Sequence, residues 1–174
     1  LFSGLGALAL VDALKIFGLQ AQVKWPNDVL LQRKKVAGIL AETVWMGMEV
    51  DSVVLGIGVN VTPAAVPPPE GLNFPATCVQ AAGQNPISRA GLLKALLEAL
   101  RSRRAGLGAE AFLRDWEAAL AFRGETVQVR VGETESLTGQ VLGLEADGSL
   151  QLGLPDGTVK IIRFGEVQLR PASL

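Results

Sequence analysis

The residues best suited to chemistry are gathered in one stretch, Lys24-Trp25-Pro26-Asn27-Asp28, with a further lysine, Lys35, soon after it. A Pro-Asn-Asp sequence cannot continue a helix or a regular strand, so the backbone is expected to turn there. Apolar runs at 29–31 and 36–44 flank the polar residues 32–35 and predict a β-hairpin. Such a hairpin would carry Lys35 back toward the Asn-Asp pair. A cation, a carboxylate and an amide on neighbouring backbones are what a phosphate-and-magnesium site needs.

A simpler interpretation of this stretch is a hairpin whose charged tip lies in solvent and binds nothing. Trp25 also has two interpretations. An aromatic side chain beside a turn full of polar groups could line a pocket, or it could anchor the core. The residues alone leave both alternatives open.

A second candidate segment is Gly56-Ile57-Gly58-Val59-Asn60, within a largely apolar run at 52–61 that predicts a strand buried on both faces. Glycine weakens a strand unless something must approach the backbone closely, so the two glycines favour a place where a ligand lies. Asn60 would offer an amide donor and acceptor at the strand end. The alternative is a β-bulge capped by Asn60. The segment is not a dinucleotide-binding fingerprint, because no helix is predicted to open there.

The composition excludes several classes of chemistry. The chain of 174 residues has no histidine, which removes Ser-His-Asp and Cys-His nucleophiles, histidine-ligated zinc and histidine proton shuttles. Cys78 is the only cysteine, so a cysteine metal cluster and an internal disulfide are excluded, which is compatible with a reducing cytoplasm. The 16 basic and 17 acidic side chains nearly cancel, which argues against nucleic-acid or membrane-surface binding by bulk charge. No signal-peptide pattern and no apolar run of about 18 residues is present, so no spanning helix is predicted.

Hydrophobic spacing divides the chain into two predicted domains, 1–122 and 123–174. In the first, apolar residues at helical spacing predict helices at 1–18, 76–82, 88–104 and 109–120, with a further short strand at 22–25 and a proline-rich surface loop at 62–74. From Glu125 onward the period is two, and tight turns are expected at Asp147-Gly148 and Asp156-Gly157. Further strands are predicted at 137–144, 149–154, 158–162 and 166–169, which together favour a small barrel without candidate chemistry.

Three blocks resemble the biotin protein ligases in order and spacing: the stretch 24–28, then Lys35-Val36-Ala37-Gly38-Ile39-Leu40-Ala41-Glu42, then 56–60. The tail is similar too, with Ala76-Thr77 before a helix pair and a barrel ending Gly165-Glu166-Val167-Gln168-Leu169-Arg170. The resemblance covers essentially the whole chain. It implies an α+β fold, in which a mixed sheet with packed helices, related to class II aminoacyl-tRNA synthetases, is followed by an SH3-like β-barrel.

The resemblance also implies a two-step reaction. Biotin and ATP, with Mg²⁺, would give biotinyl-5'-AMP and pyrophosphate, and the biotinyl group would pass to a lysine of the biotin carboxyl carrier domain of acetyl-CoA carboxylase. Lys35 matches the family lysine that bridges the biotin carboxylate and the phosphate. Asp28, with Asn27, would order magnesium and the phosphates, and Asn60 would read the adenine. The backbone would close on biotin at Gly38, Leu40, Gly56 and Gly58.

Other expectations concern partners and extent. Dimerisation by sheet extension is what the family likeness implies. The charge balance, the lack of a long apolar run and the single cysteine predict a cytoplasmic protein without nucleic-acid or membrane partners. The chain lacks the family's upstream Gly-Arg-Gly-Arg loop and Ser-Thr pair, and the predicted first helix has no cap before Leu1. Upstream residues are therefore expected to belong to the same domain, and the chain expressed from Leu1 is expected to be poorly soluble and inactive. The alternatives are a lipoate-type ligase of the same superfamily and a non-catalytic fragment that binds ligand or carrier.

Overall fold

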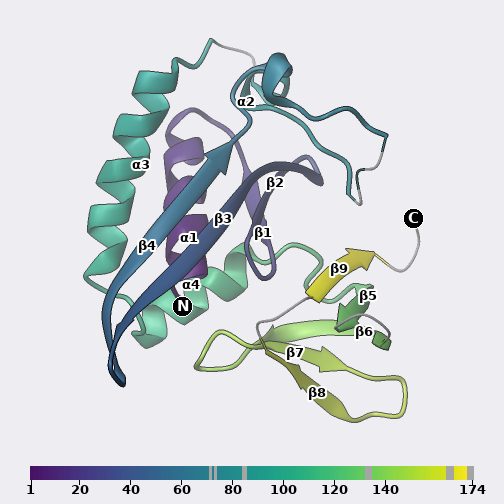
Figure 1. The fold of residues 1–174 in the computed structure, drawn as a ribbon. Coiled ribbons are helices and arrows are strands. Elements are labelled where there is room, and N and C mark those ends of the chain that lie inside the picture. Colours follow the sequence, from purple (N-terminus) through teal and green to yellow (C-terminus); the bar gives the residue numbers. More distant parts are fainter. Residues whose placement is uncertain (71, 73, 84–85, 132–134, 164–166, 172–174) are drawn as a thin grey trace.

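The structure is a computed structural model, and it describes residues 1–70, 72, 74–83, 86–131, 135–163 and 167–171. Gly165 and Glu166, which the sequence places in the last strand and its approach, lie outside the described residues. The described residues form two antiparallel sheets and four α-helices (Figure 1). Within the described residues, no helix is long and apolar enough to span a bilayer.

The first sheet has four strands in the order β1-β2-β3-β4, each antiparallel to its neighbour. Parallel pairing enters at two isolated bridges beside this sheet, Val23 with Leu120 and Lys35 with Ala76. The α+β class with a C-terminal β domain, predicted from the sequence, is confirmed. The strands are β1 (Ala21–Lys24), β2 (Asp28–Leu31), β3 (Lys34–Met46) and β4 (Glu49–Val59).

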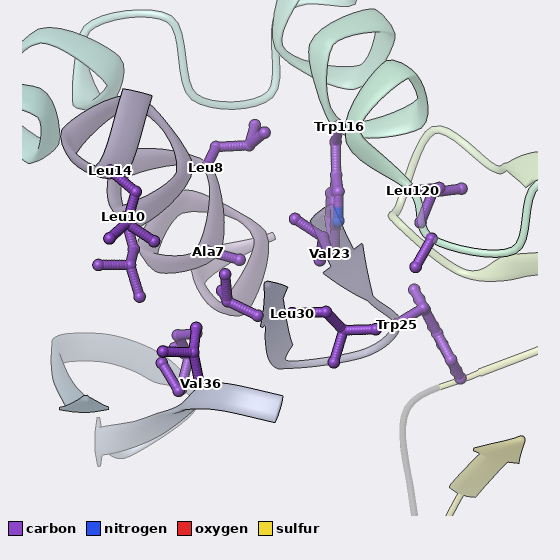
Figure 2. Close-up of a cluster of buried hydrophobic side chains, with 14 of the residues drawn as sticks. Ala7, Leu8, Leu10, Leu14, Val23, Trp25, Leu30, Val36, Trp116 and Leu120 are labelled. Atoms are coloured by element: carbon purple, nitrogen blue, oxygen red, sulfur yellow. The ribbon is translucent and has the colours of Figure 1, made fainter. Parts of the chain in front are cut away.

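Helix α1 (Phe2–Ile16) packs against one face of this sheet and is buried along most of its length (Figure 1). Apart from Asp12 and Lys15, its residues are apolar or small, because it meets the sheet on one side and other helices on the other. A Cβ built on Gly4 would lie 2.5 Å from the Trp116 ring, so only glycine permits this close approach. Figure 2 shows Leu8, Leu10 and Leu14 of α1 among the buried side chains of the core, with Leu8 on the side of the helix away from Val36. As expected, no side chain caps the helix at Leu1.

The remaining helices follow the sequence predictions. Ser88 caps α3 by accepting a hydrogen bond from the Gly91 N–H at 3.0 Å. Arg103 pairs with Asp12 of α1 and Asp115 of α4, at 2.5 and 2.7 Å, which ties the three helices together and raises the pKa of Arg103. The helix predicted at 76–82 is shorter, because 76–78 run extended beside Lys35. These elements are α2 (Val79–Ala82), α3 (Arg89–Arg104), α4 (Glu110–Ala119) and a 3₁₀ turn, η1 (Pro63–Ala65).

The second sheet has five antiparallel strands in the order β8-β7-β6-β5-β9. Both predicted tight turns are present, with Gly148 and Gly157 at φ of 84° and 85°. In each turn the preceding aspartate accepts a hydrogen bond from the backbone N–H two residues later. The strands are β5 (Thr126–Val131), β6 (Glu135–Leu144), β7 (Leu150–Gly153), β8 (Val159–Ile162) and β9 (Val167–Pro171).

Two expectations about β4 are wrong. The strand is not buried on both faces: from Val53 to Val59 the side chains alternate between half-buried and exposed. The reason is that α1 covers one face, and no described element covers the other. The glycines of β4 do not form a bulge either, since the pairing with β3 is regular there and the register shift lies at Val44/Trp45.

Candidate active site

Asp28 is the centre of the candidate site, because its two carboxylate oxygens each hold a different lysine. The Lys35 Nζ lies 2.5 Å from Oδ1, and the Lys24 Nζ lies 2.8 Å from Oδ2. Lys24 stands opposite Asp28 across the β1–β2 turn. The predicted return of Lys35 to the Asn-Asp pair by a hairpin is therefore confirmed. Two cations sharing one anion leave a net positive charge that can attract an anionic ligand.

A β-bulge in β3 brings Lys35 onto the correct face. Asp28 pairs with Gly38 and Val29 with Ala37, but Leu30 pairs with Lys35, so Val36 is one extra residue in β3. In a regular strand, residues three apart point to opposite faces. The extra residue places Lys35 and Gly38 on the same face, and a Cβ on Gly38 would lie 3.5 Å from the Lys35 Nζ. Bulges near active sites re-aim side chains in this way.

The two lysines differ in exposure. The Lys35 side chain is 41% exposed, whereas those of Lys24 and Asp28 are 10% and 11% exposed. The Lys24 Nζ also lies 5.1 Å from the centroid of the Phe74 ring, a cation–π distance. Lys35 is thus the cation that a ligand can reach, and Lys24 is the one that neutralises a buried carboxylate.

Next to Lys35, the exposed face of β3 and β4 is bare of side chains except for Leu40, which is 58% exposed. Gly38 faces Gly58, and Leu40 faces Gly56. These four predicted biotin-binding residues therefore form one surface, the glycine floor. A Cβ at Gly38, Gly56 or Gly58 would meet its nearest neighbour at 3.5–3.9 Å, which is ordinary contact. The fold would accept larger residues there, so the glycines are not needed for packing.

The two candidate asparagines hold backbone segments together. The Asn27 Nδ2 donates to the Ile39 carbonyl at 2.8 Å, and the Ile39 N–H donates to the Asn27 carbonyl at 2.8 Å. The Asn60 Nδ2 donates to the Thr77 carbonyl at 3.1 Å. Asn60 follows the last residue of β4, and its N–H donates to the carbonyl of Val36 in β3. Val36 is the neighbour of Lys35 in sequence, so the bond places Asn60 close to Lys35.

Sequence reasoning missed the segment that fixes the Lys35 backbone. The Lys35 N–H donates to the Pro75 carbonyl at 2.7 Å, and the Thr77 N–H donates to the Lys35 carbonyl at 2.8 Å. Phe74, just before this segment, was interpreted as the end of a surface loop. The one signal was a lone aromatic residue closing a proline-rich stretch. Trp25, for which two interpretations stood open, is a core anchor: it is 1% exposed and donates from Nε1 to the Gly148 carbonyl at 2.9 Å (Figure 2).

The fold and site define an α+β domain with a cationic, glycine-floored surface, joined to a small β domain. Solved biotin protein ligases share this architecture. The enzyme from Aquifex aeolicus matches with a TM-score of 0.81 and 26% identity, over 98% of this chain and 74% of that one. Its complex with biotin and ATP matches with a TM-score of 0.79 and 26% identity, over 98% and 71%.

Sequence comparison agrees. A model of the biotin/lipoate A/B protein ligase family matches residues 2–60, and a model of the biotin protein ligase C terminal domain matches residues 122–170. The biotin–[acetyl-CoA-carboxylase] ligase of Paracoccus denitrificans is 36% identical, over 95% of this chain and 71% of that protein. The chain belongs to the biotin protein ligase family.

Other relatives are longer proteins. The bifunctional ligase/repressor BirA of Bacillus subtilis is 32% identical over 90% of this chain, and BirA of Bacillus spizizenii is likewise 32% identical over 90%. In both cases the match spans 49% of the relative, so this chain covers about half the length of these proteins.

Proposed function

We propose that this chain carries part of the catalytic machinery of a biotin protein ligase, including Lys35, Asp28 and Asn60. In the first step, the biotin carboxylate attacks the α-phosphorus of ATP, forming biotinyl-5'-AMP and releasing pyrophosphate. In the second, the ε-amine of a carrier lysine attacks the acyl carbon, and AMP leaves. We also propose that the catalytic part is 1–122 and that 123–174 forms the SH3-like C-terminal domain.

The observation that carries this proposal is the exposed Lys35 Nζ beside the glycine floor. Two anions, a carboxylate and a phosphate, repel each other as they approach. A lysine is a compact charge on a long stem, so Lys35 can lie between both groups and stabilise the charge that builds on the phosphoryl oxygens. Because the glycines add no side chains, a compact bicyclic ligand such as biotin would lie against the backbone at Gly38, Leu40, Gly56 and Gly58, with its carboxylate toward Lys35.

The nucleotide would lie at the other end of the site, near Asn60. Its Nδ2 is engaged by the Thr77 carbonyl, so Oδ1 is the atom that would accept from the adenine amino group. Asn27 uses its Nδ2 on the Ile39 carbonyl, which suits a residue that shapes the phosphate site through the backbone. Asp28 keeps both lysines in place until phosphate competes for Lys35.

Magnesium fits this donor set only together with ATP. The described residues contain no group of three acidic, histidine or cysteine side chains close enough to hold a metal. Mg²⁺ is usually bound through one or two carboxylates plus substrate phosphates, and Asp28 would be that carboxylate here. The ion would supply further positive charge to the phosphates. The residues of this chain supply the orientation of both reactants and the Lys35 charge.

For the second step, the partner we propose is the biotin carboxyl carrier domain of acetyl-CoA carboxylase, on the basis of the Paracoccus relative's name.

A homodimer formed by sheet extension is a second proposal. Within the described residues β4 is an open sheet edge, whereas β1 is bordered by the bridge from Val23 to Leu120. Pairing of β4 with β4 of a second copy would continue the sheet. Sedimentation of the purified chain would test it.

The cytoplasm is the compartment we propose, since Cys78 is a free, buried thiol.

The decisive experiment measures pyrophosphate–ATP exchange in three separate reactions: with biotin, with lipoate, and without either acid. It is followed by transfer of labelled biotin to a carrier domain and to the variant of that domain in which the acceptor lysine is replaced by arginine. Exchange with biotin, and labelling of the carrier that needs its lysine, would support the proposal. Exchange with lipoate alone would identify a lipoate-type ligase. Biotin binding in calorimetry without any exchange would identify a binding fragment instead of an enzyme.

A further inference from the structure

The turn of the hairpin that carries Lys35 has an unfavourable backbone. Gln32 and Arg33, between β2 and β3, have φ of 51° and 61°, which is the left-handed region. Residues with a Cβ rarely adopt this conformation, and turns of this type normally use Asn-Gly or Gly-Gly. Such a conformation persists where the surrounding structure holds it. Lys35 is two residues after Arg33. Contacts that fix the position of Arg33 therefore also restrict the position of the Lys35 backbone.

The Arg33 side chain is held by the segment that leads into the second sheet. Its guanidinium makes two parallel hydrogen bonds to the Glu125 carboxylate, at 2.9 Å to Oε1 and 3.0 Å to Oε2. The Arg33 Cζ also lies 4.6 Å from the centroid of the Phe122 ring. Planar two-point pairing and stacking on a ring are geometries that arginine provides and lysine does not.

A second chain of contacts runs from Phe122 to the same lysine. The Phe122 ring packs edge-to-face on Phe74, with centroids 6.3 Å apart. Phe74 precedes Pro75, whose carbonyl accepts the Lys35 N–H. The Phe74 ring is also the one beneath Lys24. Phe122 is 3% exposed and itself has a φ of 64°, so its ring is fixed by its surroundings.

We propose that Arg33, Glu125 and Phe122 are positioning residues for adenylate formation, which hold the Lys35 Nζ against Asp28 from the start of the second sheet. The inference rests on the proposed function. None of the three touches the glycine floor or Asp28 within the described contacts. Their action is therefore on where Lys35 lies and not on which ligand binds. The turnover rate should depend on them more than the KM for biotin.

The test uses Arg33→Glu, Glu125→Arg and the double variant with the charges exchanged, all in the full chain. Small misplacement of a catalytic group lowers turnover strongly, so each single variant should lose about tenfold in kcat. The KM for biotin should stay within about twofold, since the ligand-contacting groups are unchanged. The double variant should recover part of the loss, because the ion pair is restored with opposite polarity while the contact of a guanidinium at position 33 with the Phe122 ring stays lost. The matched control is Arg114→Glu, which breaks the exposed Arg114–Glu110 pair on α4 and should leave kcat unchanged.

Hydrogen exchange separates this proposal from the proposed function. The Lys35 and Thr77 amides, which hold the hairpin to residues 75–77, should exchange faster in both single variants and exchange more slowly in the double variant than in either single variant. Unchanged exchange and unchanged kcat in the single variants would overturn the positioning role. A wild-type chain that makes no adenylate, but shows the exchange pattern, would refute the proposed activity while the coupling between Arg33 and Lys35 stands.

Discussion

Gly38 of β3 lies directly opposite Gly58 of β4 on the exposed face of the first sheet, immediately beside the Lys35 ammonium group. Neither residue has a positive φ, and neither is crowded by other atoms. Two glycines facing each other weaken a sheet, because they contribute no cross-strand contact and have high entropy when unfolded. A ligand that lies against the backbone, as we propose for biotin, would explain their presence.

Gly58→Val is therefore expected to abolish biotin binding without harming the fold. A Cβ at this position meets only the Gly38 carbonyl at 3.9 Å, and valine favours strands, so the melting temperature should hold or rise. Calorimetry with biotin measures the binding, and thermal melting measures the fold. Ser52→Val, six residues away on the same exposed face of β4, is the control and should bind biotin normally. Normal biotin affinity in Gly58→Val would refute the floor as the binding surface.

Lys35→Ala is expected to lower the rate of pyrophosphate–ATP exchange by about 10²–10³, the usual effect of removing one charge-stabilising donor. The Lys35 side chain is 41% exposed, and the residue lies next to the bulge at Val36. The fold should therefore survive the change, as circular dichroism would show. Lys94→Ala, at an exposed position on α3, should be silent. Near-normal turnover in Lys35→Ala would remove the basis of the assignment.

Lys24→Met should act mainly on stability. Asp28 is buried, and the variant leaves its Oδ2 without the Lys24 partner at 2.8 Å. A stranded buried polar group costs about 1–3 kcal/mol, and urea unfolding would measure this loss. The residual folded protein should keep a larger share of its activity than Lys35→Ala. Equal stability to the wild type, with complete loss of turnover, would instead assign the chemistry to Lys24.

Asn60→Ala is expected to weaken ATP binding by roughly 1–3 kcal/mol and biotin binding much less. The variant also loses the bond from Nδ2 to the Thr77 carbonyl, so a modest decrease in melting temperature should accompany it. Calorimetry with each ligand separates the two effects. An equal loss for ATP and biotin would mean that Asn60 serves as a structural cap at the end of β4.

The Arg33–Glu125 pair predicts a pH dependence of stability. The hydrogen bonds from Arg33 hold the pKa of Glu125 below its ordinary value of 4.5. A carboxylate whose pKa is lowered in the folded state stabilises the protein at pH values above its ordinary, unfolded-state pKa. That contribution is lost as the pH falls through the folded-state pKa. Glu125→Gln should therefore melt slightly below the wild type at neutral pH, and the difference should vanish at acidic pH below the folded-state pKa. A constant difference across the whole range would contradict the assignment to this pair.

Much of the fold was predictable because local patterns and long-range packing agree. The apolar helix at 1–18, the cap at Ser88 and the turns at Asp147-Gly148 and Asp156-Gly157 depend on neighbouring residues alone. The approach of Lys35 to Asp28 followed from a short hairpin, whose ends must meet.

The failures have a common cause in tertiary context. The exposed face of β4 was predicted wrongly because Val54 and the two glycines make the run 53–59 look continuously apolar, although apolar residues at every second position are typical of a strand with one exposed face. The bulge at Val36 has no sequence signature, as it depends on the register between β2 and β3. Likewise, Arg33 and Glu125 are 92 positions apart, and the sequence offers no sign that these two charges meet.

The three tryptophans lie in environments that give the protein its own optical reporters. Trp45, near the tip of the β3–β4 hairpin, is 62% exposed, while Trp25 and Trp116 are 1% and 0% exposed. Fluorescence from Trp45 should be red-shifted and open to quenching by acrylamide, and the other two should be shielded from it. Any molecule that settles on the hairpin tip would protect Trp45 alone. Separation of the two sheets would break the bond from Trp25 to the Gly148 carbonyl and would be seen in Trp25 instead. The emission spectrum can thus tell association at the hairpin from opening between the sheets without any added label.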